Sequence, residues 1–129
     1  MAGSGEAAAW PEETIPVLRV DDVQRALPWY RRLGFEQEWE HRFEPGFPVF
    51  TSLRRGPDGP GVRVFLSEHR GDAEPNGLIH LRVSDVAPIA TEFGVPIADM
   101  GRRLEVQLQD PDGNRFRVDC LSGRDSNTG

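Results

Sequence analysis

The stretch QLQDPDGNRFRV, residues 107–118, has alternating apolar and polar residues on both sides of a Pro-Asp-Gly-Asn sequence. Alternation with a period of two is typical of half-buried strands. Pro111 presets φ for a tight turn, and Asp112, Gly113 and Asn114 tolerate the positive φ that a reversal needs. The stretch therefore predicts two strands joined by a tight turn.

A weaker copy of this pattern lies upstream. Pro57-Asp58-Gly59 is followed by Val62-Arg63-Val64. In both copies an arginine, Arg63 or Arg117, stands four residues after the glycine. Pro-Asp-Gly alone is a common turn, so it is the repetition that carries the prediction.

The beginnings of the two copies also repeat. Residues 18–23 (LRVDDV) correspond to residues 81–86 (LRVSDV), and each precedes a helix-like segment. An internal repeat of this length predicts two copies of one structural unit, at about residues 14–70 and 77–120. We therefore expect an α/β (α+β) fold of two pseudo-symmetric βαβββ units, with helices outside and concave sheets around a cleft.

Length and composition indicate one globular domain. At 129 residues, 37% of them hydrophobic, the chain is long enough to bury a core. Residues 1–13 and 122–129 are rich in small and polar residues, so we expect a mobile N-terminal tail and a loose C-terminal tail around a domain at 14–121. Trp10-Pro11 interrupts the first tail and could dock on a partner subunit.

Charge and cysteine content limit the classes of function. The net charge of −6 argues against nucleic-acid binding and permits a cationic ligand. No apolar run approaches the roughly 20 residues of a membrane span. The single cysteine, Cys120, cannot form an internal disulfide, which agrees with a reducing, cytoplasmic location.

Alternation also sorts the predicted strands into faces. In residues 35–43 it places Trp39 and Phe43 on one face and three glutamates, Glu36, Glu38 and Glu40, on the other. Faces without charge should meet the helices, which leaves the mixed faces toward a cleft. Arg19 and Arg82 belong to such mixed faces. The residues expected to bind a ligand are Trp39, Phe43, Phe50, Phe65, Arg63, His80, Glu105, Gln107 and Arg117.

The repeated units, together with residues 29–35 (WYRRLGF) and 110–114 (DPDGN), resemble the vicinal oxygen chelate superfamily. That superfamily includes glyoxalase I, extradiol dioxygenases, fosfomycin-resistance enzymes and bleomycin-resistance proteins. The resemblance extends from Ile15 to Cys120. Residues 64–73 (VFLSEHRGDA) are most similar to the bleomycin-resistance branch.

The resemblance implies four metal-ligand positions in the enzymatic members, normally held by His and Glu. Carried over to this sequence, they are Ile15, Leu78, Arg117 and Arg63. Two of these side chains are aliphatic and two are permanently cationic, so none can ligate a metal. His80 lies two residues beyond the second position, but one histidine does not make a site. We expect no metal and no other cofactor.

The resemblance and the absence of metal ligands favour an antibiotic-resistance protein that binds and sequesters a partly aromatic DNA-damaging antibiotic without modifying it. The acidic composition favours a cationic bleomycin-type glycopeptide, whereas the arginines of the cleft favour the electron-rich oxygens of an enediyne-like ligand; the sequence leaves both open. The alternatives are a metal-independent isomerase or lyase, with Glu68 and Glu105 as a proton-transfer pair, and a regulatory module with a vestigial cleft. In the superfamily units often pair across chains, so we expect a homodimer with clefts at the subunit interface.

Pairing of Glu105 with Arg117 or Arg63 would neutralise charges buried in such a cleft. We expect no catalytic residue, because the sequence has no nucleophile elbow, no phosphate-binding loop and no local cysteine–histidine signature.

Overall fold

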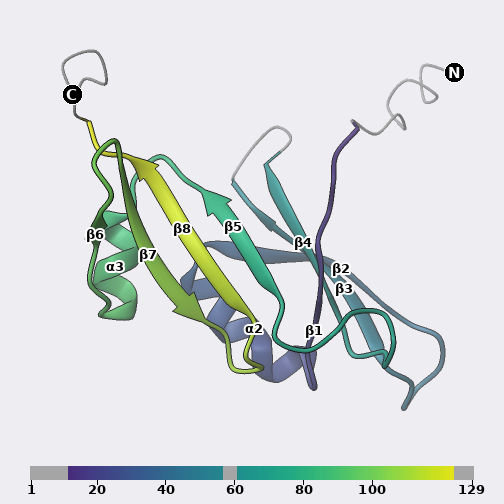
Figure 1. Cartoon of the computed structure of the whole chain (residues 1–129). Helices are drawn as coiled ribbons and strands as arrows, with labels where there is room; N and C mark the ends of the chain where they lie inside the picture. Colours follow the sequence, from purple (N-terminus) through teal and green to yellow (C-terminus); the bar gives the residue numbers. More distant parts are fainter. Residues whose placement is uncertain (1–11, 57–60, 124–129) are drawn as a thin grey trace, which may run out of the picture.

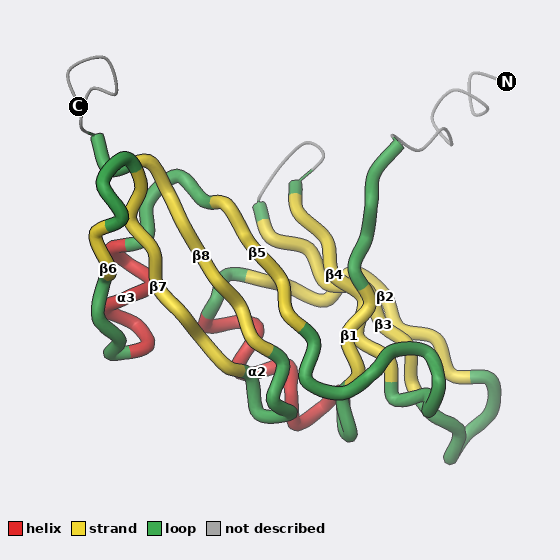
Figure 2. Tube along the Cα trace, in the orientation of Figure 1, coloured by secondary structure: helices red, strands yellow, loops and turns green. Residues whose placement is uncertain are grey.

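The computed structural model describes residues 12–56 and 61–123, which form two four-stranded sheets lying side by side (Figures 1 and 2). The strand order in the first sheet is β1 (Val17–Arg19), β4 (Val62–Ser67), β3 (Val49–Arg55) and β2 (Phe35–Arg42). The order in the second is β5 (Leu78–Arg82), β8 (Arg115–Leu121), β7 (Arg103–Gln109) and β6 (Ala98–Asp99). In each sheet the first strand is parallel to its neighbour and the other pairs are antiparallel.

The two sheets repeat one topology. Helix α2 (Val23–Arg32) follows β1, and helix α3 (Ala87–Phe93) follows β5, so each unit has the order β-α-β-β-β. The predicted pair of βαβββ units is therefore confirmed. The first strand after α3, β6, is only two residues long.

Aspartates precede both helices, and a glycine follows α2. The side chain of Asp22 accepts hydrogen bonds from the backbone N–H groups of Gln24 and Arg25, as expected of an N-cap. After α2 ends, Gly34 has a φ of +99°, which glycine adopts without steric cost. At the start of α3, Asp85 accepts the N–H of Ala87, although the N-cap position belongs to Val86.

One hydrophobic core joins both sheets to α2. The ring of Trp29 lies 5.6 Å from that of Phe116 in β8 and 5.3 Å from that of Phe93 in α3, between centroids. The ring of Tyr30, the next residue of α2, lies 6.1 Å from that of Phe35 in β2, between centroids. Helix α2 of the first unit therefore packs on both sheets, and in Figure 1 it lies behind β5 and β8.

Each sheet has a second face, turned away from the helices, which we call its open face. On β4 and β8 the buried residues Val64, Leu66, Phe116 and Val118 alternate with residues of the open faces. The strand register extends these faces across the sheets. The open face of the first sheet carries Trp39, Phe50, Ser52, Arg63 and Phe65. That of the second carries Leu78, His80, Arg82, Arg103, Glu105, Gln107, Gln109, Arg115, Arg117, Asp119 and Leu121.

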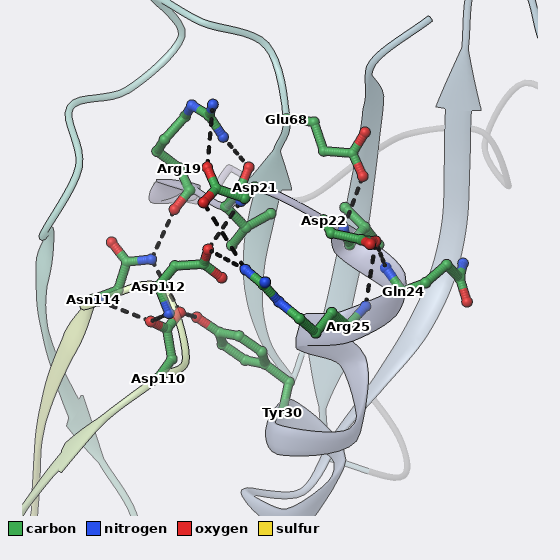
Figure 3. Close-up of polar contacts among 12 residues, drawn as sticks. Arg19, Asp21, Asp22, Gln24, Arg25, Tyr30, Glu68, Asp110, Asp112 and Asn114 are labelled. Atoms are coloured by element: carbon green, nitrogen blue, oxygen red, sulfur yellow. Dashed lines mark hydrogen bonds and ion pairs between the residues drawn. The ribbon is translucent and has the colours of Figure 1, made fainter. Parts of the chain in front are cut away.

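The tight turn at residues 110–114 ties the two units together (Figure 3). The hydroxyl of Tyr30 in α2 donates a 2.6 Å hydrogen bond to Asp110, 80 residues away. Asn114 donates from its side chain to the backbone carbonyl of Arg19 at 2.9 Å and accepts the N–H of Gly77 at 2.9 Å. Asp112 accepts from the backbone N–H of Asp21 at 3.0 Å. We call Tyr30, Asp110, Asp112 and Asn114 the polar joint.

The polar joint is buried and electrostatically defined. Asp110 and Asn114 are 3% and 0% exposed. Burial, followed by the neighbouring charge of Asp110, raises the pKa of Tyr30 far above its usual range, so the phenol keeps its proton and acts as a donor. The signature residues in WYRRLGF and DPDGN thus hold the two units together.

Three expectations concern residues outside the described ranges: residues 1–11 of the N-terminal tail, with Trp10-Pro11, the first Pro-Asp-Gly turn at 57–59, and the end of the second tail at 124–129. Within residues 12–56 and 61–123, neither helix has the length and apolar character needed to span a membrane.

Candidate functional site

Three aromatic side chains gather on the open face of the first sheet. The rings of Trp39, Phe50 and Phe65 lie 5.1 to 6.1 Å apart between centroids, and Trp39 is nearly parallel to Phe50 at 17°. Trp39 is 46% exposed, although it touches both neighbours. We call these three residues the aromatic cluster; it offers an accessible indole face and ring edges to a flat molecule.

A β-bulge brings Trp39 onto this face. The register of β2 on β3 shifts between Gln37 and Trp39, so Phe35 and Gln37 lie on the helix side while Trp39 pairs with Ser52 on the open side. The expectation that Glu36, Glu38 and Glu40 share a solvent face is wrong, because the bulge separates them. Glu38 instead bonds to groups of the open face.

The arginine beside the aromatic cluster is neutralised. Arg63 forms a two-point contact with the carboxylate of Glu38, at 2.8 and 3.1 Å, and a 2.8 Å contact with Glu13. Ser52 donates a further 2.8 Å bond to Glu38. The hydrogen bonds from Arg63 hold the pKa of Glu38 below its usual range. This network holds polar groups at the edge of the aromatic cluster, and in it the guanidinium of Arg63 is ion-paired with carboxylates.

The open face of the second sheet is polar. Asp119, 1% exposed, receives contacts from Arg82 at 3.1 Å, His80 at 2.9 Å and Arg103 at 3.4 Å. Glu105, 5% exposed, is bonded to Arg103 at 2.7 Å. The residue that bonds to Glu105 is therefore Arg103, rather than Arg117 or Arg63, and the charge of Arg117 acts on Glu105 without a direct contact. Arg103 lies two residues before Glu105 on the same face of β7, close enough to take that place.

Gln107 completes this network by donating to Glu105 at 3.3 Å. Hydrogen bonds from Arg82 lower the pKa of Asp119, and hydrogen bonds from Arg103 lower that of Glu105. Asp119, Arg103 and Glu38 were absent from the predicted ligand-binding residues. Asp119 could have been found, because it lies two residues after Arg117 on the same face.

These carboxylates predict a stability that falls in acid. A carboxyl group whose folded-state pKa is depressed stabilises the protein above its unfolded pKa, about 4, and loses that contribution as the pH falls through the folded value. We expect the melting temperature to be level near neutral pH and to fall below about pH 4. Asp119→Asn should lower the melting temperature at pH 7 and show a smaller fall between pH 7 and pH 3. An unchanged acid slope in this variant would contradict the assignment.

The predicted ligand-binding residues do not all lie at one place. Trp39, Phe50 and Phe65 form the aromatic cluster, and His80, Glu105, Gln107 and Arg117 share the open face of the second sheet. Arg63 and His80, from different sheets, line one cavity of about 310 Å³ together with apolar side chains, among them Phe35, Ile79 and Phe116. Phe43 stands apart: it is 71% exposed and contacts Phe47 at 5.7 Å, beyond the end of β2.

The residues at the superfamily's metal-ligand positions do not fit a divalent metal. Leu78 and Ile15 offer no donor atom, and Arg63 is bonded to Glu38 and Glu13. In the described part of the chain, no group of three or more His, Cys, Asp or Glu side chains is placed to hold an ion.

Comparisons with known proteins agree with this architecture. A bleomycin-binding protein solved in complex with bleomycin is 19% identical, with a TM-score of 0.62 over 87% of this chain and 100% of that one. The bleomycin resistance determinant encoded on transposon Tn5 is 20% identical, with a TM-score of 0.60 over 87% and 99%. The fosfomycin resistance protein FosX from Listeria monocytogenes is 12% identical, with a TM-score of 0.63 over 89% and 97%.

At these identities the solved structures establish the fold alone. No curated protein sequence matches this chain. The family described as glyoxalase superfamily protein matches residues 5–121, which is nearly the whole sequence. The fold and this match confirm the predicted resemblance to vicinal oxygen chelate proteins, and the chain belongs to the glyoxalase superfamily.

Proposed function

We propose that this chain is an antibiotic-resistance protein that binds and sequesters a drug-sized, partly aromatic DNA-damaging antibiotic without modifying it. The ligand is a bleomycin-type glycopeptide or an enediyne-like molecule, and the binding protein is a cytoplasmic homodimer with ligand clefts at the subunit interface. The observation that carries this proposal is the aromatic cluster, because its half-exposed indole lies on an open sheet face beside a neutralised arginine.

The aromatic cluster supports the binding of a flat ring system. Stacking of one ring on another contributes about 0.5–1.5 kcal/mol beyond the burial of area. The guanidinium of Arg63 next to it, bonded to Glu38 and Glu13, places polar groups at the edge of the rings. A surface of this kind orients a heteroaromatic ligand through its polar substituents.

A homodimer would complete the clefts. The open faces carry exposed apolar side chains that a partner could cover, Trp39 at 46%, Leu78 at 51% and Leu121 at 83%. We expect light scattering at micromolar concentration to give the mass of two chains. A monomer mass at that concentration would contradict the interface clefts.

Binding without modification is tested by pairing thermal shift with mass spectrometry. A ligand at 100 times its Kd should stabilise the folded protein by about 2.7 kcal/mol. We expect a bleomycin-type or an enediyne or anthraquinone antibiotic to raise the melting temperature and to be recovered with its mass and NMR spectrum unchanged. If no antibiotic in such a panel raises the melting temperature, the proposal is wrong.

Trp39 should contribute to affinity rather than to stability. We expect Trp39→Ala to weaken binding of the antibiotic found in that panel by about 1–3 kcal/mol, because the stacking surface is lost. Trp39→Phe should weaken it much less. Both are measured by titration calorimetry, with the melting temperature of the ligand-free variants recorded beside them.

The matched control is Phe47→Ala, which removes an aromatic side chain of similar exposure, 44%, away from the aromatic cluster. It should leave the affinity unchanged. If Trp39→Ala lowers the melting temperature sharply and leaves affinity intact, the indole is a packing residue, and the binding surface must be sought elsewhere.

A metal-independent isomerase or lyase is the second candidate, and the His80–Asp119 contact favours it. A histidine held through Nε2 by a buried carboxylate, here at 2.9 Å, keeps its Nδ1 available for proton transfer. Such an enzyme would alter its ligand. Incubation in D₂O would then introduce deuterium or change the mass of the recovered molecule, and His80→Gln would abolish that change.

A further inference from the structure

The open face of the second sheet carries more positive than negative charge, in a chain of net charge −6. Its carboxylates are Glu105 and Asp119, and its four arginines are Arg82, Arg103, Arg115 and Arg117. Both carboxylates are almost fully buried and already bonded, Asp119 to Arg82 and Arg103 and Glu105 to Arg103. The charges of Arg82 and Arg103 are therefore compensated within the sheet.

Arg115 and Arg117 have no such partner. Both are exposed, and within residues 12–56 and 61–123 neither guanidinium forms a hydrogen bond or an ion pair. The charge of Arg117 contributes to the low pKa of Glu105, but less than the direct hydrogen bond from Arg103 does. Two guanidinium groups on one face of β8 thus form no direct contact with a carboxylate in the described part of the chain.

The residues paired directly with these arginines carry no negative charge, and the nearest carboxylates, Glu105 and Asp119, lie one position further along the same face and are bonded to Arg103 and Arg82. Arg115 pairs with Leu78 and Gln109, and Arg117 pairs with His80 and Gln107. Positions i and i+2 of a strand lie about 6.7 Å apart on the same face. Two rows of the sheet therefore present a pair of guanidinium groups flanked by amide and imidazole groups, which suits a carboxylate, sulfonate or phosphate.

An apolar hollow adjoins these rows. A cavity of about 400 Å³ is lined by residues 95–98 and by the side chains of Glu105 and Gln107. Ile97 in its wall is 41% exposed. Because Gln107 lines the hollow and is the register partner of Arg117, an apolar group in the hollow and an anionic group on the arginines can belong to one molecule.

We propose that the ligand of this chain is an aromatic anion, whose negative group binds Arg115 and Arg117 and whose apolar part lies in the hollow of residues 95–98. The inference rests on the proposed function, since it names the chemical class of the ligand and adds contacts on the open face of the second sheet, whereas the aromatic cluster lies on the first. Of the two ligand classes that the sequence left open, it favours the enediyne-like molecule and disfavours the cationic glycopeptide.

The experiment compares two dyes that share one ring system. 1-Anilinonaphthalene-8-sulfonate carries a sulfonate, and N-phenyl-1-naphthylamine lacks it. In fluorescence titrations at low salt, we expect the unmodified protein to bind the sulfonate at least about tenfold more tightly, the effect of one charge-assisted hydrogen bond. Arg115→Gln and Arg117→Gln should each remove most of this preference and leave the affinity for the neutral dye unchanged.

Arg42→Gln is the matched control. It removes the same charge from an exposed side chain whose register partner, Val49, faces the helices, so the dye preference should not change. An equal loss of preference in Arg42→Gln would attribute the effect to net charge and overturn the inference. Equal affinity of the unmodified protein for both dyes would also overturn it, while leaving the proposed function standing if binding depends on Trp39. Failure of both dyes and of every antibiotic to bind would overturn the proposed function and the inference with it.

Discussion

Replacing Asp110 by alanine is expected to lower the free energy of unfolding by about 4 kcal/mol. The buried carboxylate accepts the backbone N–H groups of Asp112 and Asn114, both at 2.8 Å, together with the Tyr30 hydroxyl and the Asn114 amide. Each hydrogen bond to a charged group contributes about 1.5–3 kcal/mol, although shared partners make the sum less than additive. Alanine leaves those donors buried without an acceptor. Urea unfolding followed by circular dichroism measures the loss.

Asp85→Ala is the matched control for this variant. Asp85 accepts one exposed N–H, that of Ala87, so its loss should cost about 1 kcal/mol or less. Asp110→Ala should also lower the melting temperature by more than about 10 °C, given the size of the chain. A loss similar to that of Asp85→Ala would mean that the polar joint does not hold the units together.

Replacing Phe116 by alanine should be similarly costly, at about 3–5 kcal/mol. Its ring is 1% exposed and lies 5.6 Å from Trp29 and 5.8 Å from Tyr30, so the truncation opens a cavity between α2 and the second sheet. Because α2 belongs to the first unit, this cavity weakens the contact between units. We expect one cooperative transition with the same midpoint by tryptophan fluorescence and by circular dichroism, shifted to lower denaturant.

Phe43→Ala makes the same change at a 71% exposed position and should cost less than about 0.5 kcal/mol. Phe116→Leu, which refills most of the volume, should recover more than half of the lost stability. Two separate transitions in Phe116→Ala, one for each sheet, would contradict a core shared by both units.

The fold could be predicted because the chain contains the same signals twice. Residues 18–23 and 81–86 each lead from a strand into a helix, and each unit then supplies three strands with alternating side chains. The two strands and the turn at residues 103–121 could be predicted from the alternation of residues on either side of Asp110 and Gly113, and they are confirmed. Local patterns of this kind depend on the residues themselves rather than on distant contacts.

The arrangement of the open faces was harder to predict. The alternation of Phe35, Gln37 and Trp39 is unbroken in the sequence, yet the bulge before Trp39 reverses the faces along β2. No glycine at the bulge signals it in the sequence. The extra residue is Glu38, whose side chain bonds to Ser52 and Arg63 on the neighbouring strands. These contacts depend on the neighbouring strands, so the residue pattern of β2 alone does not predict the bulge.

The partners of the charged residues were also not determined by strand patterns alone. Arg103, Arg63 and Arg117 all share open faces with carboxylates, but only the three-dimensional distances assign Arg103 to Glu105 and Arg63 to Glu38 and Glu13. Arg117 forms no hydrogen bond or ion pair in the described part of the chain, although its charge acts on Glu105. The presence or absence of an ion pair is what distinguishes Arg103 and Arg63, which have structural partners, from Arg117, which is a candidate for contact with a ligand.

The hydrogen bond from Tyr30 to Asp110 also bears on how the chain folds during synthesis. Its two ends are 80 residues apart, so at about 5–20 residues per second the acceptor is made roughly 4–16 seconds after the donor. Until then α2 has neither the acceptor for its phenol nor the Phe116 ring against which it packs. The contacts of α2 with Asp110 and Phe116 therefore form only after most of the second unit has been synthesised, and contacts of such high sequence separation slow folding.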